Sequence, residues 1–187
     1  MNRKRKIYIN APITLTFAGI CVLALVLQYI TNDASTYLLF STYGSSPFKL
    51  LTYVRLIGHI FGHADFSHLL SNMLYILLLG PMLEEKYGNK LITIIIATAL
   101  VTGIFHNLFD PHVVLLGASG VVFSFILLSS VTGKDKGIPV TLILVAIFWI
   151  GGEIYTGLTT ADSISQITHI LGGIVGALLG LALKDNR

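Results

Sequence analysis

Apolar residues gather in six long runs along the chain, separated by short polar segments. An α-helix rises about 1.5 Å per residue, so runs of this length suit helices that cross the roughly 30 Å hydrocarbon core of a bilayer. The pattern therefore predicts an all-α, polytopic membrane protein with six transmembrane helices. The six runs occupy residues 13–30, 67–83, 90–108, 117–132, 138–157 and 165–183.

Most connections between the runs have the composition of short turns. Glycine, asparagine and proline mark them at Tyr87-Gly88-Asn89, at Asp110-Pro111 and across 132–139. The exception is the connection 31–66, which is long and too apolar for a flexible linker. We expect it to form a structured outer loop between the first two helices, partly helical and lying at the membrane surface. The chain 1–187 is then a single membrane domain.

Composition agrees with a membrane location. Of the 187 residues, 54% are hydrophobic and 11% are charged, and the mean hydropathy is +0.81, which is too apolar for a water-soluble core. The net charge of +3 reflects how charges are distributed around membrane spans, so we expect no nucleic-acid partner. Cys21 is the single cysteine, so an intrachain disulfide is excluded. Its position in an apolar run indicates a packing role.

The lysines and arginines predict the orientation, because these residues resist translocation. With the N-terminus in the cytoplasm, only Lys49 and Arg55 of the 12 fall on the outer side. We therefore predict a basic cytoplasmic segment 1–12 and a cytoplasmic tail 184–187, in a bacterial cell membrane. The start imitates a signal peptide but has no small-residue cleavage site, so we expect a retained first span. The cytoplasmic cations are Arg3, Lys4, Arg5, Lys6, Lys86, Lys90, Lys134, Lys136, Lys184 and Arg187.

Four polar residues fall at one depth in this topology. The second, fourth and sixth spans all run inward, which places His68, Asn72, Ser119 and His169 in the outer half of the bilayer. Such side chains are costly in lipid unless they face a polar cavity. A hydroxyl and an imidazole at matching depths suit a nucleophile and its general base, so we predict these roles for Ser119 and His169.

Glycines strengthen that interpretation. A serine in a membrane helix commonly bonds its own helix, and a lone histidine commonly bonds a neighbour. Here Gly117 and Gly120 flank Ser119 and leave backbone N–H groups open at a helix start, where an oxyanion can bind. Beyond His169, glycines recur every four residues, which permits close approach of another helix even if they serve only packing. They are Gly172, Gly176 and Gly180.

Together these motifs resemble the rhomboid family of intramembrane serine proteases. In chain order they are Arg55 in the outer loop, His68 with Asn72, Gly117-Ala118-Ser119-Gly120, and His169 with Gly172 and Gly176. The resemblance implies a six-helix bundle that cleaves transmembrane segments of other proteins without a cofactor or metal.

By the same resemblance, Ser119 is the nucleophile and His169 is the base and then the acid. His68 and Asn72 stabilise the oxyanion together with the Ser119 backbone N–H. No acidic residue stands three or four positions from His169, so we expect a dyad. The chain departs from the family pattern at Val54 and Phe123, where tryptophan and tyrosine are common.

Other classes of protein fit less well. His59, His63 and His68 are candidate metal ligands, but no carboxylate is placed with them. A transporter or channel calls for charged residues at mid-membrane, which the spans lack. A non-catalytic relative that binds membrane proteins is the closer alternative. We expect His106 and His112, which flank an outer turn, to be solvated.

Overall fold

The computed structural model describes residues 7–131 and 163–183, and only isolated positions from 140 to 151 between them. The predicted span 138–157, the basic residues 1–6, the connection 132–139 and the tail 184–187 lie wholly or largely outside the described residues. The described elements are helical. They are α1 (Pro12–Ile30), α2 (Ala34–Leu39), α3 (Leu50–Gly58), the 3₁₀ helix η1 (His59–Phe61), α4 (Phe66–Tyr87), α5 (Lys90–Phe109), α6 (Ser119–Val131) and α8 (Ser163–Ala182).

Five of the predicted apolar runs coincide with α1, α4, α5, α6 and α8 to within a few residues. Within the described part of the chain, three helices are long and apolar enough to cross a membrane: α1, α4 and α5. Shorter apolar helices cover Ser119–Ser130 and Ile167–Ala182. Side chains such as Leu23, Leu74 and Leu78 are exposed on the outside of the bundle, as expected for a surface solvated by lipid.

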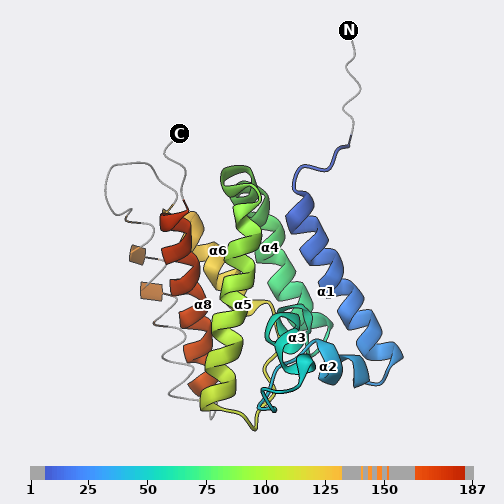
Figure 1. The fold of residues 1–187 in the computed structure, drawn as a ribbon. Helices are drawn as coiled ribbons and strands as arrows, with labels where there is room; N and C mark the ends of the chain where they lie inside the picture. The colour runs from blue at the N-terminus through green and yellow to red at the C-terminus, as the bar shows by residue number, and fades with distance from the viewer. Residues whose placement is uncertain are drawn as a thin grey trace.

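Among the described helices, the long ones stand side by side with α1 at one edge and α8 at the other, and α2 and α3 lie across one end (Figure 1). Helix α8 packs against both α5 and α6. The contact between α8 and α6 is close: a Cβ atom at Gly172 would lie only 2.8 Å from the Gly120 carbonyl oxygen. One turn further, a Cβ at Gly176 would collide with the side chain of Ser124. The glycine stripe therefore lets the two helix backbones meet.

The connection 31–66 contains α2, α3 and η1, and it is tied to the segment that precedes α6. Thr42 and Leu115 exchange two backbone hydrogen bonds of 2.9 Å, and the Gly44 N–H donates to the Pro111 carbonyl over the same distance. Cys21 is fully buried in α1, within the main apolar core, as its position in an apolar run predicts. The connection 31–66 thus braces the backbone that leads into Ser119.

Two acidic side chains fix helix starts. Asp65 caps α4, because its Oδ1 accepts the backbone N–H of His68 at 2.8 Å. Glu84, near the other end of α4, accepts the N–H groups of Ile13 and Thr14 at the start of α1, both at 2.8 Å. Pro12 occupies the first turn of α1, where a missing N–H costs nothing. These contacts set the heights of α1 and α4 relative to each other.

Candidate active site

Ser119 and His169 lie in contact across the α6–α8 interface. Ser119 is the first residue of α6, and its Oγ lies 2.8 Å from Nε2 of His169 on α8. This is a hydrogen-bond distance, and the serine hydroxyl is the group that always carries a proton to donate. The structure therefore brings together two of the residues that the sequence singles out, although 50 positions separate them.

The Phe123 ring supports the imidazole. Phe123 is one turn after Ser119 on α6, and its ring stacks on that of His169 with centroids 4.9 Å apart and planes inclined by 19°. A flat ring on the imidazole face restricts rotation of His169 about its side-chain bonds. Phe123 stands where the family commonly has tyrosine, and it contacts His169 with its ring but offers no hydroxyl.

Gly117 adopts a backbone conformation that suits glycine, with φ of +128°. A Cβ there would lie 2.9 Å from Cε1 of His68 and 3.7 Å from Oγ of Ser119. Its N–H donates to the His59 carbonyl at 2.9 Å. Gly117 therefore leaves room for the His68 ring directly beside the serine hydroxyl.

His68 presents its Nε2 to this space. The backbone N–H of Ala64 donates to His68 Nδ1 at 3.4 Å, so Nδ1 acts as an acceptor. In a neutral imidazole the other nitrogen then carries the proton. A Cβ atom on Gly117 would lie 3.0 Å from His68 Nε2 and 3.7 Å from Ser119 Oγ, so both atoms border the same space. His68 is thus placed to donate a hydrogen bond near the serine.

Asn72 is buried one turn after His68 on α4. Its Nδ2 donates to the His68 carbonyl oxygen at 3.0 Å, within its own helix. An amide nitrogen carries two protons, so this bond leaves one donor on Asn72. The structure places Asn72 beside His68 but directs one of its protons along α4.

A cavity of about 10 Å³ adjoins the serine and imidazole. That volume is close to the lower limit for one water molecule, and its lining combines polar and apolar residues. Its lining includes His59, Thr102, Gly117, Ser119, Thr168 and His169. Thr102 and Thr168 are not among the predicted site residues, since threonines in membrane helices are too common to mark a site.

Buried histidines surround the site. His59 and His63 are at most 2% exposed, and burial lowers the pKa of each to about 4. Both therefore stay neutral at physiological pH. His63 also packs edge-on against His68, with ring centroids 5.0 Å apart.

The expectation for His106 is wrong. His106 is 1% exposed, and its Nε2 lies 3.0 Å from the Val113 carbonyl, which accepts the hydrogen bond. The reason is that the turn after α5 folds back over the helix end, so a residue near a loop becomes buried. His112, by contrast, is exposed as expected.

The candidate metal ligands are engaged in other ways. Nδ1 of His63 lies 3.1 Å from the Phe61 carbonyl, and Nε2 of His59 lies 3.4 Å from the Thr102 hydroxyl. Among residues 7–131 and 163–183 no three histidine, cysteine or acidic side chains converge as metal ligands do.

Arg55 lies in α3 and anchors the connection 31–66. It is buried, its Nη1 donates to the Tyr43 hydroxyl at 2.8 Å, and its guanidinium lies 4.2 Å from the centre of the Tyr43 ring. The neighbouring Val54 is exposed. The loop anchor therefore pairs Arg55 with Tyr43, a partner that sequence spacing does not reveal.

Comparison with known proteins agrees with the motifs. A family profile described as Rhomboid domain matches residues 51–186. The chain is similar to proteins named Rhomboid protease GlpG: it is 28% identical to that of Yersinia pestis (strain Pestoides F) over 183 residues and 26% identical to that of Serratia proteamaculans (strain 568) over 182 residues. In both cases the match covers 94% of this chain and 63% of the relative, so the chain spans less than two thirds of their length.

Proposed function

Because this chain belongs to the rhomboid family, we propose that it is an intramembrane serine endopeptidase that uses Ser119 and His169 as its catalytic dyad. The observation that carries this proposal is the 2.8 Å contact between Ser119 Oγ and His169 Nε2. A hydroxyl alone is a weak nucleophile, and an imidazole within hydrogen-bond reach is the usual means of activating it.

The proposed reaction proceeds in two stages. His169 Nε2 takes the Ser119 proton as Oγ attacks the scissile carbonyl, and it then gives that proton to the departing amine. Water attacks the resulting acyl ester with His169 again as base, and the Ser119 hydroxyl is restored. With no acidic residue near His169 in sequence, the Phe123 ring replaces a carboxylate in holding the imidazole.

Three donors suit the oxyanion that forms in each stage. They are the Ser119 backbone N–H at the start of α6, His68 Nε2 and Asn72 Nδ2. The placement of His68 beside Gly117 and Ser119 supports its part, whereas Asn72 has to turn its remaining proton toward the substrate. Losing one such donor typically costs about 3 kcal/mol of transition-state stabilisation.

The cavity beside Ser119 and His169 suits the hydrolytic water. It is buried within a bundle whose exterior is apolar, and hydrolysis needs a water molecule at that depth. Thr102 and the two histidines, His59 and His169, provide polar atoms on its walls. We propose that this cavity holds the water that attacks the acyl ester.

The family and the apolar helices indicate an integral membrane protein. We propose six spans in one domain over 1–187, with segments 1–12 and 184–187 in the cytoplasm and the connection 31–66 outside. This topology places Ser119 and His169 near the outer surface of the membrane. It rests on the distribution of lysine and arginine.

We propose transmembrane segments of other membrane proteins as substrates. A helix shields its carbonyls with its own hydrogen bonds, so cleavage requires local unwinding. Segments with small or helix-weakening residues near their outer ends are therefore preferred.

A single-pass reporter tests the proposal. We expect wild-type protein to cleave it near the outer end of its span, and Ser119→Ala and His169→Ala each to abolish cleavage. The matched controls Ser130→Ala and His112→Ala change residues away from the dyad and should cleave normally. Cleavage that survives both dyad changes would show that Ser119 and His169 do not carry the reaction. No cleavage by the wild-type protein would indicate a binding role without proteolysis.

Covalent labelling provides a second measurement. A serine-directed phosphonate should modify the purified wild-type protein on the peptide that contains Ser119. The His169→Ala variant should react far more slowly because its hydroxyl is not activated. Labelling spread over several serines would contradict the assignment.

A further inference from the structure

Two cavities meet at the start of α1, at the opposite end of the bundle from Ser119. One is polar, with a volume of about 680 Å³, and lies between the start of α1 and the end of α4. The other is an apolar groove of about 390 Å³ between α1, α3 and α5. Pro12 and Ile13 line both, so the two cavities share a wall.

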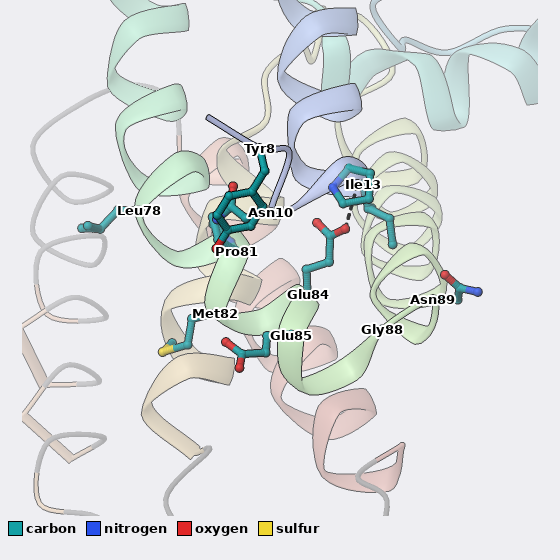
Figure 2. A pocket seen from close by; sticks show the side chains of 11 residues that line it. Tyr8, Asn10, Ile13, Leu78, Pro81, Met82, Glu84, Glu85, Gly88 and Asn89 are labelled. Atoms are coloured by element: carbon teal, nitrogen blue, oxygen red, sulfur yellow. Dashed lines mark hydrogen bonds between the residues drawn. The ribbon is translucent and has the colours of Figure 1, made fainter. Parts of the chain in front are cut away.

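The polar cavity carries negative charge. Figure 2 shows Tyr8 and Asn10 on one side and Glu84, Glu85 and Met82 on the other. The Glu84 carboxylate is committed to the start of α1, where it accepts the Ile13 N–H. Glu85 is exposed and has no hydrogen bond or ion pair within the described part of the chain. It is therefore the charged group left to meet a ligand.

The lining of this cavity also separates ligand classes. Its described residues include two carboxylates and neither lysine nor arginine. A lipid of net negative charge would find no cation among these described residues, whereas a headgroup whose phosphate is balanced by its own ammonium group would find the Glu85 carboxylate as a partner for that ammonium. Leu78, Pro81 and Met82 make part of the wall apolar, which suits the first methylene groups of an acyl chain, while Asn10 and Asn89 add polar groups that suit the glycerol esters.

The apolar groove suits a hydrocarbon chain. It follows α1 from Pro12 to Ile20, which is about 12 Å at the rise of an α-helix. Across it stand Ile57 and Phe61 at the outer-loop end and Ile92 at the start of α5. The groove therefore runs along the bundle, in the direction that a lipid acyl chain takes in a bilayer.

We propose that the two cavities together bind one phospholipid with a primary ammonium headgroup, of the phosphatidylethanolamine class. The ammonium group donates hydrogen bonds to Glu85, and one acyl chain lies in the groove between α1 and α5. Such a lipid contacts α1, α4 and α5 at once and stabilises their arrangement by binding the folded state. This site is separate from the dyad and does not depend on proteolysis.

Native mass spectrometry of the delipidated full chain tests the proposal. The probes are dioctanoyl phosphatidylethanolamine, phosphatidylcholine and phosphatidylglycerol, which share their chains and differ in headgroup. We expect one phosphatidylethanolamine to bind, about tenfold more tightly than either other lipid, since only its headgroup donates N–H bonds to a carboxylate. Equal retention of all three lipids would overturn the proposal and indicate a non-specific lipid shell.

Variants locate the site. Glu85→Gln should reduce phosphatidylethanolamine affinity to that of phosphatidylcholine, while Asp33→Asn, which removes an acid in the loop after α1, should leave it unchanged. Thr16→Trp fills the groove and should weaken all three lipids, and Leu15→Trp, which adds the same ring outside it, should not. Tighter binding of phosphatidylglycerol than of phosphatidylethanolamine, or full binding in Glu85→Gln, would contradict the ammonium site.

Discussion

Around Ser119, the geometry depends on two residues. Gly117 leaves space for the His68 ring, and the Phe123 ring restrains the imidazole of His169. Gly117 has a positive φ and lies against the His68 ring. Phe123 stacks on His169. Neither residue carries reacting atoms in the proposed mechanism, so their effects on rate should come through the positions of His68 and His169.

We expect Gly117→Ala to slow cleavage on the order of tenfold to hundredfold, because a misplaced donor or nucleophile costs that much. The strained φ and the contact with His68 should also lower the free energy of unfolding by about 1–3 kcal/mol. Reporter kinetics and thermal unfolding in detergent measure the two effects. Gly19→Ala is the control, since nothing lies within 4 Å of its Cβ position. Normal cleavage by Gly117→Ala would refute the role of this glycine.

Phe123→Leu should lower kcat about two- to tenfold with little change in KM, because a stacked aromatic pair contributes about 0.5–1.5 kcal/mol. Phe123→Tyr keeps the ring and should restore kcat. Phe125→Leu removes a buried ring of the core that does not stack on His169, so it should lower stability rather than kcat. If Phe123→Tyr is as slow as Phe123→Leu, stacking does not position His169.

At the scale of elements, carboxylates and glycines decide how the helices sit against one another. Glu84 on α4 accepts three hydrogen bonds of 2.8 Å from the start of α1, two from backbone N–H groups and one from the Thr14 hydroxyl. A negative charge at a helix N-terminus is also favoured by the helix dipole. The Glu84 carboxylate therefore acts as the N-cap of α1, accepting backbone N–H groups that have no partner within the helix.

We expect Glu84→Gln to lower the free energy of unfolding by about 1–3 kcal/mol, since a charged acceptor is lost and one amide group is left facing N–H donors. Chemical denaturation in lipid-free detergent measures this change. Glu85→Gln alters the neighbouring exposed carboxylate and should be neutral under the same conditions. Equal stability of the Glu84 and Glu85 variants would mean that the contact with α1 contributes nothing.

Across the whole molecule, the connection 31–66, α5, α6 and α8 meet at one end of the described bundle and enclose neutral histidines. His59 and His63 have pKa values lowered to about 4 by burial, from an ordinary 6.5. The folded protein thus binds fewer protons than the unfolded chain between these values. Stability must then fall as pH falls from about 6.5 toward 4, by up to about 1.4 kcal/mol per pH unit for each histidine.

Thermal unfolding in detergent between pH 7.5 and 4.5 tests this dependence. We expect Tm to be flat above pH 7 and to fall steadily below 6.5. His63→Asn removes one buried titrating group and should reduce the slope, while His112→Asn changes an exposed histidine and should leave it as in wild type. A His63→Asn slope equal to that of wild type would show that its burial does not govern the response.

The sequence by itself determined the helical class, the ranges of α1, α4, α5, α6 and α8, and the residues that became the candidate site. These follow from local properties: apolar runs long enough to span a bilayer, glycine at turns, and polar groups that lipid makes costly. His68, Ser119 and His169 could be chosen in this way because each stands out against its own apolar neighbourhood.

Only the tertiary structure decided which of those residues touch. The 2.8 Å approach of Ser119 to His169, the burial of His106 and the reach of Glu84 to α1 all join segments that are remote in sequence or folded back on themselves. Such contacts depend on helix packing and loop paths, which no local pattern specifies. The shared wall at Pro12 and Ile13, where a polar cavity meets an apolar groove, likewise depends on helix packing and not on local sequence.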